Sequence, residues 1–316
     1  MNPKISIVTP SYNQGSFLEE TIDSVLSQGY DNLEYIIIDG GSDDDSVEII
    51  KKYEKYLKYW ISESDYGQSH AIIKGLAYCT GEIFNWLNSD DKLVEDSLNL
   101  IAGYFSRNNN IKVLSGYEIH FGGGQREELK SGTRLQVDIE SSVVFAAFYQ
   151  PSTFWRLSTF KEIGLNSNLH YLMDTDMWVR FLLRYGTDGY MKIKNPIARF
   201  RLHHQSKSLS SSHDFFKERW QLRSRLLHDN VKNMDISGII DTLAPSPRLE
   251  GYNYKSQLFD KNQLKCLVLQ QLLIDLNSER KINESLRVFY KGLLSGFWNI
   301  SFLRAGLKSH ILAFSK

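Results

Sequence analysis

The stretch ISIVTPSYNQGSFLEETIDSVLSQGYDNLEYIIIDGG, residues 5–41, decides the fold class of this chain. It begins with the β-branched run ISIVT, continues through a polar turn into FLEETIDSVLSQ, and ends in a second apolar run, LEYIIID. A β-branched apolar run predicts a strand, and apolar residues spaced three or four apart predict an amphipathic helix. The stretch therefore predicts a strand, helix, strand unit, which is the building block of a parallel sheet.

The same alternation continues to about residue 110. Further strands are expected at KYWISE (58–63) and EIFNWLN (82–88), and further helices at SVEIIKKYEKYL (46–57) and SHAIIKGLAYC (69–79). Because crossovers between parallel strands are right-handed and place helices above and below the sheet, this pattern predicts an α/β fold with helices on both faces.

The pattern changes after residue 110. A strand at IKVLSGYEIHF (111–121) leads into three glycines and a hairpin partner, and a helix is expected at MDTDMWVRFLLRYG (173–186) before a strand that ends in FRLHH (200–204). From about Ser210 onward the signal is helical, interrupted by the break APSPRLEGYNYKS (244–256). We therefore expect a catalytic domain at residues 1–210 and a helical C-terminal extension at 211–316.

Composition excludes several classes of protein. Lysine plus arginine and aspartate plus glutamate number 37 each, so the chain has no excess positive charge with which to hold a nucleic acid. Cys79 and Cys266 lie far apart in apolar surroundings, which favours a reducing compartment over a disulfide framework or a zinc site. With neither a secretory signal nor an apolar run of membrane-spanning length, the cytoplasm is the expected location.

The four expected strands of the first 110 residues all end in polar segments. These are TPSYNQG (9–15), DGGSDDD (39–45), ESDYGQSH (63–70) and NSDD (88–91). Since ligands bind beyond the carboxyl ends of parallel strands, the four segments predict one wall of a pocket. The glycine motifs of dinucleotide-binding folds and of P-loop NTPases are missing.

Asp90 and Asp91 are adjacent carboxylates at the fourth of these ends. One interpretation is a solvated turn or a helix cap. The other is a Mg²⁺ or Mn²⁺ site, because carboxylate oxygens suit these ions and a cation placed between the pair and a diphosphate would neutralise both.

The motifs ISIVTPSYNQ, IIIDGGSDD, ESDYGQSHAIIKGLAYCTGEIFNWLNSDD, YQPSTFWR, MDTDMWVRF and FRLHHQS, in this order, resemble those of family 2 glycosyltransferases over roughly residues 4–208. The resemblance implies a GT-A fold, a Rossmann-like nucleotide-diphospho-sugar transferase fold with a mostly parallel central sheet. It implies metal-dependent transfer of a hexosyl or N-acetylhexosaminyl group, with inversion, from a UDP-sugar type of donor to an acceptor hydroxyl. Residues 1–110 would bind the nucleotide sugar and residues 111–210 the acceptor.

The resemblance also assigns roles to individual residues at the strand ends. The donor-binding set it implies is Thr9, Pro10, Tyr12, Asn13, Asp39, Asp65, Gly67, Gln68 and Asp90, and it gives Asp91 to the metal. Within this set the first four line the nucleobase site, Asp39 accepts a hydrogen bond from the base, and the others lie near the ribose and the sugar. An Asx turn at Asp39 and a plain turn at DYG (65–67) are the alternatives.

Within residues 111–210, the resemblance makes Asp174 the base that takes the acceptor proton, while Asp176 would point elsewhere on the helix. The alternative is that both favour a helix N-terminus by charge alone. His203 is the expected metal or phosphate contact, with Arg201 as its neighbouring alternative. Gln150 and Trp155 are expected on the acceptor side, although an aromatic residue at this spacing also suits core packing.

Two rival functions and one further partner remain open. A nucleotidyltransferase would share the nucleotide pocket and the metal, and a non-catalytic sugar-nucleotide or glycan-binding module would keep only the pocket. The C-terminal stretch 290–316 is apolar and basic without an acidic residue, which is typical of an interfacial helix and also of a helix packed on a domain. The first interpretation predicts peripheral contact with the inner face of the membrane and a lipid-linked glycan acceptor in polysaccharide or envelope synthesis.

Overall fold

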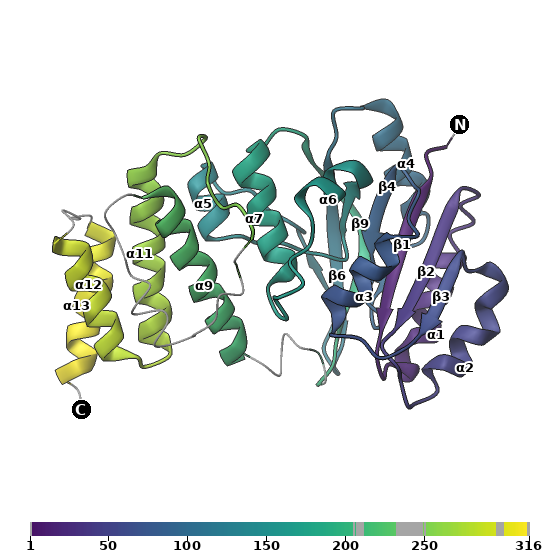
Figure 1. Ribbon diagram of the computed structural model, residues 1–316, viewed down its shortest axis with the longest axis horizontal. Coiled ribbons are helices and arrows are strands. Elements are labelled where there is room, and N and C mark those ends of the chain that lie inside the picture. The colour runs from purple at the N-terminus through teal and green to yellow at the C-terminus, as the bar shows by residue number, and fades with distance from the viewer. Residues whose placement is uncertain are drawn as a thin grey trace. The chain divides into compact units, whose positions relative to one another are not determined.

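The computed structural model describes residues 2–204, 206, 212–231, 249, 251–294 and 300–314. Its contacts divide the chain into two compact units. Figure 1 colours the chain by residue number, from purple at the N-terminus to yellow at the C-terminus. The first unit comprises Met1–Arg134, Ala147–Met177 and Thr187–Ser210, and the second comprises Leu135–Ala146, Trp178–Gly186 and Ser211–Lys316.

The first unit is built on a mixed sheet with strand order β3-β2-β1-β4-β8-β6-β9-β5, in which β7 pairs with β6. Pairs β1–β2, β1–β4, β2–β3 and β6–β9 are parallel, and pairs β4–β8, β5–β9, β6–β7 and β6–β8 are antiparallel. The strands are β1 (Ile5–Ser11), β2 (Leu33–Asp39), β3 (Tyr59–Ser62), β4 (Ile83–Trp86), β5 (Lys92–Leu93), β6 (Val113–Gly122), β7 (Glu128–Lys130), β8 (Thr153–Arg156) and β9 (Tyr190–Leu202). The predicted α/β fold with a mostly parallel central sheet is confirmed.

Helices cover both faces of this sheet, because successive strand residues point to opposite sides. On one face, Ile5, Ile7 and Ile37 pack in a core cluster with residues of α1 (Gly15–Leu26), α2 (Ser46–Tyr53) and α4 (Ser97–Arg107). On the other face lie α3 (Gln68–Leu76) and α6 (Leu157–Ile163), which contact β1, β2, β4 and β8.

A glycine sets the distance between α3 and the sheet. A Cβ atom at Gly75 would lie 2.6 Å from Val8 Cγ1 and 3.2 Å from Ile38 Cγ1. Because real Cβ contacts are longer than this first distance, any larger residue at position 75 would push α3 away from β1 and β2. The close approach holds the N-terminal end of α3, with Gln68, at the carboxyl end of the parallel strands.

The second unit contains α5 (Ile139–Val144), α9 (Ser212–Asn230), α11 (Lys261–Ser278), α12 (Ile282–Leu294) and α13 (Ile300–Phe314). Helix α7 (Met173–Tyr185) begins in the first unit, and its residues from Trp178 onward belong to the second. Arg223 and Asp275 form a buried ion pair between α9 and α11, and Arg223 also donates to the carbonyl of Val144. Within the predicted break at 244–256, positions 244–248 and 250 lie outside the described residues.

Among the helices that the structure describes, none combines the length and apolar character that a membrane crossing requires. Cys79 and Cys266 are free thiols.

Glu34 on β2 is a buried carboxylate that ties three segments of the first unit together. Ser6 Oγ and the Thr80 main-chain N–H donate to Glu34 Oε2 at 2.8 Å each, and Thr80 Oγ1 donates to Oε1 at 2.5 Å. Burial by itself would raise the pKa of Glu34, but the hydrogen bonds from Thr80, Ser6 and Lys4 outweigh it and lower the pKa to about 2. The carboxylate form is therefore the one that stabilises the fold.

We predict that Glu34→Gln destabilises the protein at neutral pH. A folded pKa of about 2 against an ordinary 4.5 corresponds to about 3 kcal/mol of stability that is fully present above pH 4.5 and lost as the pH falls toward 2. Urea unfolding of wild type and variant from pH 7 to pH 2.5 measures the difference. It should shrink steadily below pH 4.5, and a constant difference across this range would show that the carboxylate charge is not what stabilises the fold.

Candidate active site

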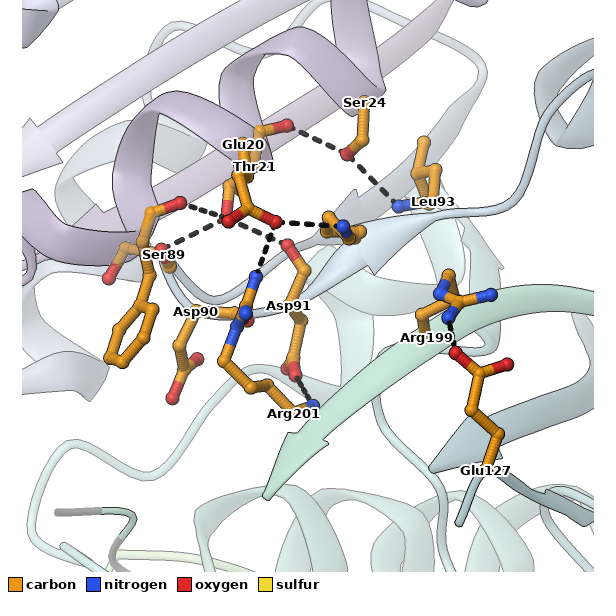
Figure 2. A network of polar contacts seen from close by, with 12 residues as sticks. Glu20, Thr21, Ser24, Ser89, Asp90, Asp91, Leu93, Glu127, Arg199 and Arg201 are labelled. Atoms are coloured by element: carbon orange, nitrogen blue, oxygen red, sulfur yellow. Dashed lines mark hydrogen bonds and ion pairs between the residues drawn. The ribbon is translucent and has the colours of Figure 1, made fainter. Parts of the chain in front are cut away.

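The site begins with the pairing of two strands that are far apart in the sequence. Lys92 and Leu93, directly after the NSDD segment, pair antiparallel with Arg199 and Ala198 of β9. Continuing this register by two residues sets Asp90 opposite Arg201. Figure 2 shows the result, with the carboxylates of Asp90 and Asp91 beside Arg201 at the end of β9.

Asp91 is fully buried, and both oxygens of its carboxylate accept hydrogen bonds from the chain. The Arg201 main-chain N–H donates to Oδ1 at 3.0 Å, and Asn88 Nδ2 donates to Oδ2 at 3.2 Å. Burial raises the pKa of Asp91, and the neighbouring charge of Asp90 raises it further. This geometry makes Asp91 an internal anchor of the NSDD turn on β9.

Asp90 instead pairs with a side chain that can bind a metal. Its Oδ2 lies 2.8 Å from Nε2 of His203, and the two side chains are 20% and 13% exposed. The ring of His203 packs against Phe17 with the ring centroids 4.7 Å apart. A carboxylate oxygen and an imidazole nitrogen are thus brought together from positions 90 and 203, whereas the predicted metal ligands were Asp91 and His203.

Arg201 holds this arrangement in place. Its Nε donates to the main-chain oxygen of Asp90 at 2.9 Å, and its guanidinium donates to Glu20 at 2.9 Å. The guanidinium also lies 4.8 Å and 4.6 Å from the ring centroids of Phe17 and Phe121. The Arg201 side chain therefore fastens the turn to α1.

The residues at the end of β1 differ in accessibility. Thr9 is buried with its hydroxyl 3.0 Å from the Tyr35 hydroxyl, and Pro10 is buried as well, whereas Tyr12 is 62% exposed. Asn13 has a φ of 52°, and its main-chain N–H donates to Ser42 while its Oδ1 accepts from the Asp43 N–H. Of the predicted nucleobase residues, Tyr12 and Asn13 are exposed, and Tyr12 is the one with a ring that a ligand can cover.

Asp39 adopts the Asx-turn geometry that was the alternative interpretation of this residue. Its Oδ2 accepts hydrogen bonds from the N–H groups of Gly41 and Ser42 and from the Ser62 hydroxyl, and its Oδ1 accepts one from the Ser42 hydroxyl. Three of these four hydrogen bonds end on Oδ2 and one on Oδ1, so the turn uses most of the acceptor capacity of this carboxylate.

The segment after β3 contacts the segments that follow β2 and β4. Asp65 Oδ1 accepts from the Gly67 N–H at 2.7 Å, and Asp65 lies so close to Gly40 that a Cβ there would be 3.1 Å from its Oδ2. Gln68, the first residue of α3, donates to Asn88 Oδ1 at 2.6 Å. Since Asn88 in turn donates to Asp91, one hydrogen-bonded chain runs from α3 to β9.

Asp174 lies in the first turn of α7 and is partly exposed, whereas Asp176 is fully buried. Met173, the residue before Asp174, has its sulfur 2.6 Å from the hydroxyl of Ser69 on α3. Ser69 also donates to the main-chain oxygen of Leu169. The helix start that carries Asp174 is therefore attached next to Gln68, at the same end of the sheet as the NSDD turn.

The two acceptor-side candidates are buried. Trp155 on β8 is fully buried and packs against Phe160 and Phe148, which is the core packing given as its alternative interpretation. Gln150 is 6% exposed and donates to Asn85 Oδ1 and to the Trp86 main-chain oxygen. Gln150 thus links the loop before β8 to β4.

A further titratable pair lies on β6 and was not among the predicted residues. Glu118 is buried, and its Oε1 lies 2.8 Å from Nε2 of His120. Its Oε2 has no hydrogen-bond partner among the described residues. A glutamate and a histidine two apart in a predicted strand point to the same face, which is the signal that could have identified the pair.

The profile of the family described as Glycosyl transferase family 2 matches residues 6–177, more than half of the 316-residue chain. The chain belongs to glycosyl transferase family 2. The predicted family membership is thus confirmed.

Curated relatives are described as glycosyltransferases. An uncharacterized glycosyltransferase of Rickettsia typhi is 30% identical over 198 residues, which cover 57% of this chain and 59% of the relative. One of Haemophilus influenzae is 34% identical over 118 residues, which cover 36% of this chain and 47% of the relative. The chain thus matches less than two thirds of the length of either relative.

Solved structures show the same fold at low sequence identity. Residues 1–349 of S. aureus TarS in complex with UDP-GlcNAc align with a TM-score of 0.59 at 16% identity, covering 93% of each chain. A mannosyltransferase from Pyrobaculum calidifontis in complex with GDP-Man and Mn²⁺ aligns with a TM-score of 0.55 at 13% identity, covering 99% of this chain and 86% of that one. The fold is of the GT-A type, as predicted.

The different surroundings of the two adjacent carboxylates lead to a stability prediction. Asp91→Ala leaves the Arg201 N–H and Asn88 without their acceptor, and each buried polar group left unsatisfied costs about 1–3 kcal/mol. We therefore expect Asp91→Ala to lower the free energy of unfolding by roughly 2 kcal/mol or more, and Asp90→Ala to lower it much less. Thermal and urea unfolding measure the free energy of unfolding of each variant. Equal losses in Asp91→Ala and Asp90→Ala would contradict the different roles given to the two carboxylates.

Proposed function

We propose that this protein is a metal-dependent, inverting glycosyltransferase that moves a sugar from a nucleotide-diphosphate donor, a UDP-sugar, to an acceptor hydroxyl. The observation that carries the proposal is the Asp90 and His203 pair at 2.8 Å, at the carboxyl end of the parallel strands. Family membership supports the reaction class, and the UDP-GlcNAc bound by TarS supports a UDP-linked hexosyl or N-acetylhexosaminyl donor.

The donor set at this point fits Mn²⁺ or Mg²⁺. Among the described residues no group of three histidine, cysteine or acidic side chains could hold a metal, and the proposal uses two protein ligands. Such ions are commonly held by one or two protein ligands, with substrate phosphates and water completing the shell. In this proposal Asp90 and His203 take the metal, and Asp91 positions Asp90 from behind. The bound ion would neutralise the charge of the leaving diphosphate.

The strand ends then bind the rest of the donor. Tyr12 is the exposed ring at the end of β1 and is proposed to cover the nucleobase, with Thr9, Pro10 and Asn13 shaping the turn beneath it. Asp39 keeps the following turn rigid. Asp65, Gly67 and Gln68 stand next to Asn88 and are proposed to meet the ribose and the sugar.

Asp174 is proposed as the base. A sugar hydroxyl is a weak nucleophile, so its proton must leave as its oxygen attacks the anomeric carbon from the face opposite the diphosphate. Asp174 is the carboxylate of MDTD that reaches the surface, and its helix is attached beside the donor-binding end of α3. The acceptor, a glycan or lipid-linked glycan, would be bound by parts of residues 111–210.

The activity is tested by incubating the full chain with a panel of UDP- and GDP-sugars and Mn²⁺, and measuring release of nucleoside diphosphate and Mn²⁺ affinity. Asp90→Asn or His203→Asn removes one of two protein ligands and should weaken Mn²⁺ binding by about 10-fold or more, with activity falling in parallel. Asp96→Asn is a matched control, because Asp96 is exposed and its φ of 59° suits asparagine.

Three outcomes separate this function from its rivals. Release of pyrophosphate from nucleoside triphosphates with a sugar phosphate would identify a nucleotidyltransferase. Donor binding without any turnover would identify a binding module. Full activity in excess EDTA would contradict the metal.

A separate prediction concerns the base. Asp174→Asn keeps the shape of the side chain but cannot take the proton, so kcat should fall by roughly 10²- to 10⁴-fold while the affinity for the donor barely changes. Initial-rate kinetics with the donor identified by the panel, together with calorimetric binding of the nucleoside diphosphate, measure both. Near-normal kcat, or loss of donor affinity instead of rate, would remove Asp174 from this role.

A further inference from the structure

Helix α13 has a buried stripe and an exposed apolar stripe on opposite sides. One stripe, formed by Phe302, Ala305, Gly306 and Ser309, is buried against α11 and α12. The other contains Ile300, Leu307 and Ile311, which are 68%, 58% and 68% exposed. Residues 300, 307 and 311 recur at the spacing of one helical face, about half a turn away from the buried stripe.

The buried stripe is fully used in packing. The rings of Phe302 and Phe289 on α12 lie 5.4 Å apart, Ser309 Oγ lies 2.8 Å from Ser285 Oγ, and Asn277 of α11 donates to the Ala305 carbonyl at 3.2 Å. The internal packing of the three helices therefore does not need the outer stripe. Its exposed isoleucine and leucine side chains are unexplained by the fold of this unit.

Helix α12 repeats the arrangement. Val288, Phe289 and Gly292 are buried, whereas Tyr290 and Leu294 are 50% and 88% exposed. The exposed apolar side chains of α12 and α13 alternate along each helix with cations, namely Arg287, Lys291, Arg304 and Lys308, all of which are exposed. We call these exposed apolar and basic side chains of the two helices the outer surface. Figure 1 shows the two helices side by side at the C-terminal end of the chain.

The charge of this segment is one-sided although the whole chain is balanced. After Glu284 the sequence contains the five basic residues Arg287, Lys291, Arg304, Lys308 and Lys316 and no acidic residue. Long basic side chains next to apolar ones are the composition of helices that lie in a membrane interface, where the stem is buried and the charge reaches the headgroups.

We propose that the outer surface binds the interface of an anionic membrane. The apolar side chains of α12 and α13 insert at the boundary between headgroups and acyl chains, and the four exposed cations bind lipid phosphates. A second copy of this chain is the less suitable occupant, because a two-fold contact through the outer surface would bring Arg304 and Lys308 of one copy toward those of the other. The proposal is independent of the transfer reaction, since it concerns binding alone.

The test is cosedimentation of the full chain with vesicles of neutral phosphatidylcholine and with vesicles containing 30% phosphatidylserine, at low and high salt. Binding to the anionic vesicles only, weakened at high salt, is expected because exposed charges are screened. Arg304→Gln with Lys308→Gln should weaken partitioning roughly 30-fold, at about 5-fold per cation. Leu307→Ser with Ile311→Ser should weaken it about 10-fold or more even at low salt.

Two control variants carry the same chemical changes elsewhere. Lys51→Gln with Lys52→Gln removes two exposed cations from α2, and Leu129→Ser with Val137→Ser removes two exposed apolar side chains. Both controls should bind vesicles like the wild type. Equal binding by all variants, or no binding of the wild type to anionic vesicles, would overturn the proposal. Concentration-dependent self-association in sedimentation velocity that Leu307→Ser with Ile311→Ser abolishes would also overturn it, in favour of a second copy.

Discussion

The arrangement of the candidate site depends on the antiparallel pairing of β5 with β9. Two residues, Lys92 and Leu93, pair with Arg199 and Ala198, and this short ladder brings positions near 90 beside positions near 200. Arg201 extends the connection, since its main chain holds Asp91 and its side chain holds the Asp90 carbonyl and Glu20. Without this pairing the carboxylate of Asp90 and the imidazole of His203 would belong to unrelated loops.

The pairing also explains why two adjacent carboxylates suit this turn. The turn sends the two side chains in different directions, so the Asp91 carboxylate is buried while the Asp90 carboxylate stays partly exposed. Asp91 is the inward one, satisfied by an N–H of β9 and by Asn88. Asp90 is partly exposed beside His203. The hydrogen bonds from Arg201 and Asn88 offset part of the cost of burying the Asp91 carboxyl group.

The sequence predicted the local elements well because their signals are local. The alternation of β-branched runs with helix-period segments predicted β1 to β4 and α1 to α3, and the motif order predicted the GT-A fold. What it could not predict is which member of a pair faces inward. The contacts of Asp91 with Arg201 and of Trp155 with Phe160 depend on long-range packing, and the Glu118 and His120 pair has no motif around it.

We propose that Asp90 and His203 together bind the cation that neutralises the leaving diphosphate. Electron spin echo envelope modulation of Mn²⁺ bound to the full chain with UDP is the sharpest test, because an imidazole ligand gives nitrogen modulation. Nitrogen modulation is expected in the wild type and in His204→Gln, and its loss is expected in His203→Gln. Bound Mn²⁺ without nitrogen modulation in the wild type, or modulation that survives His203→Gln, would remove His203 from the metal site.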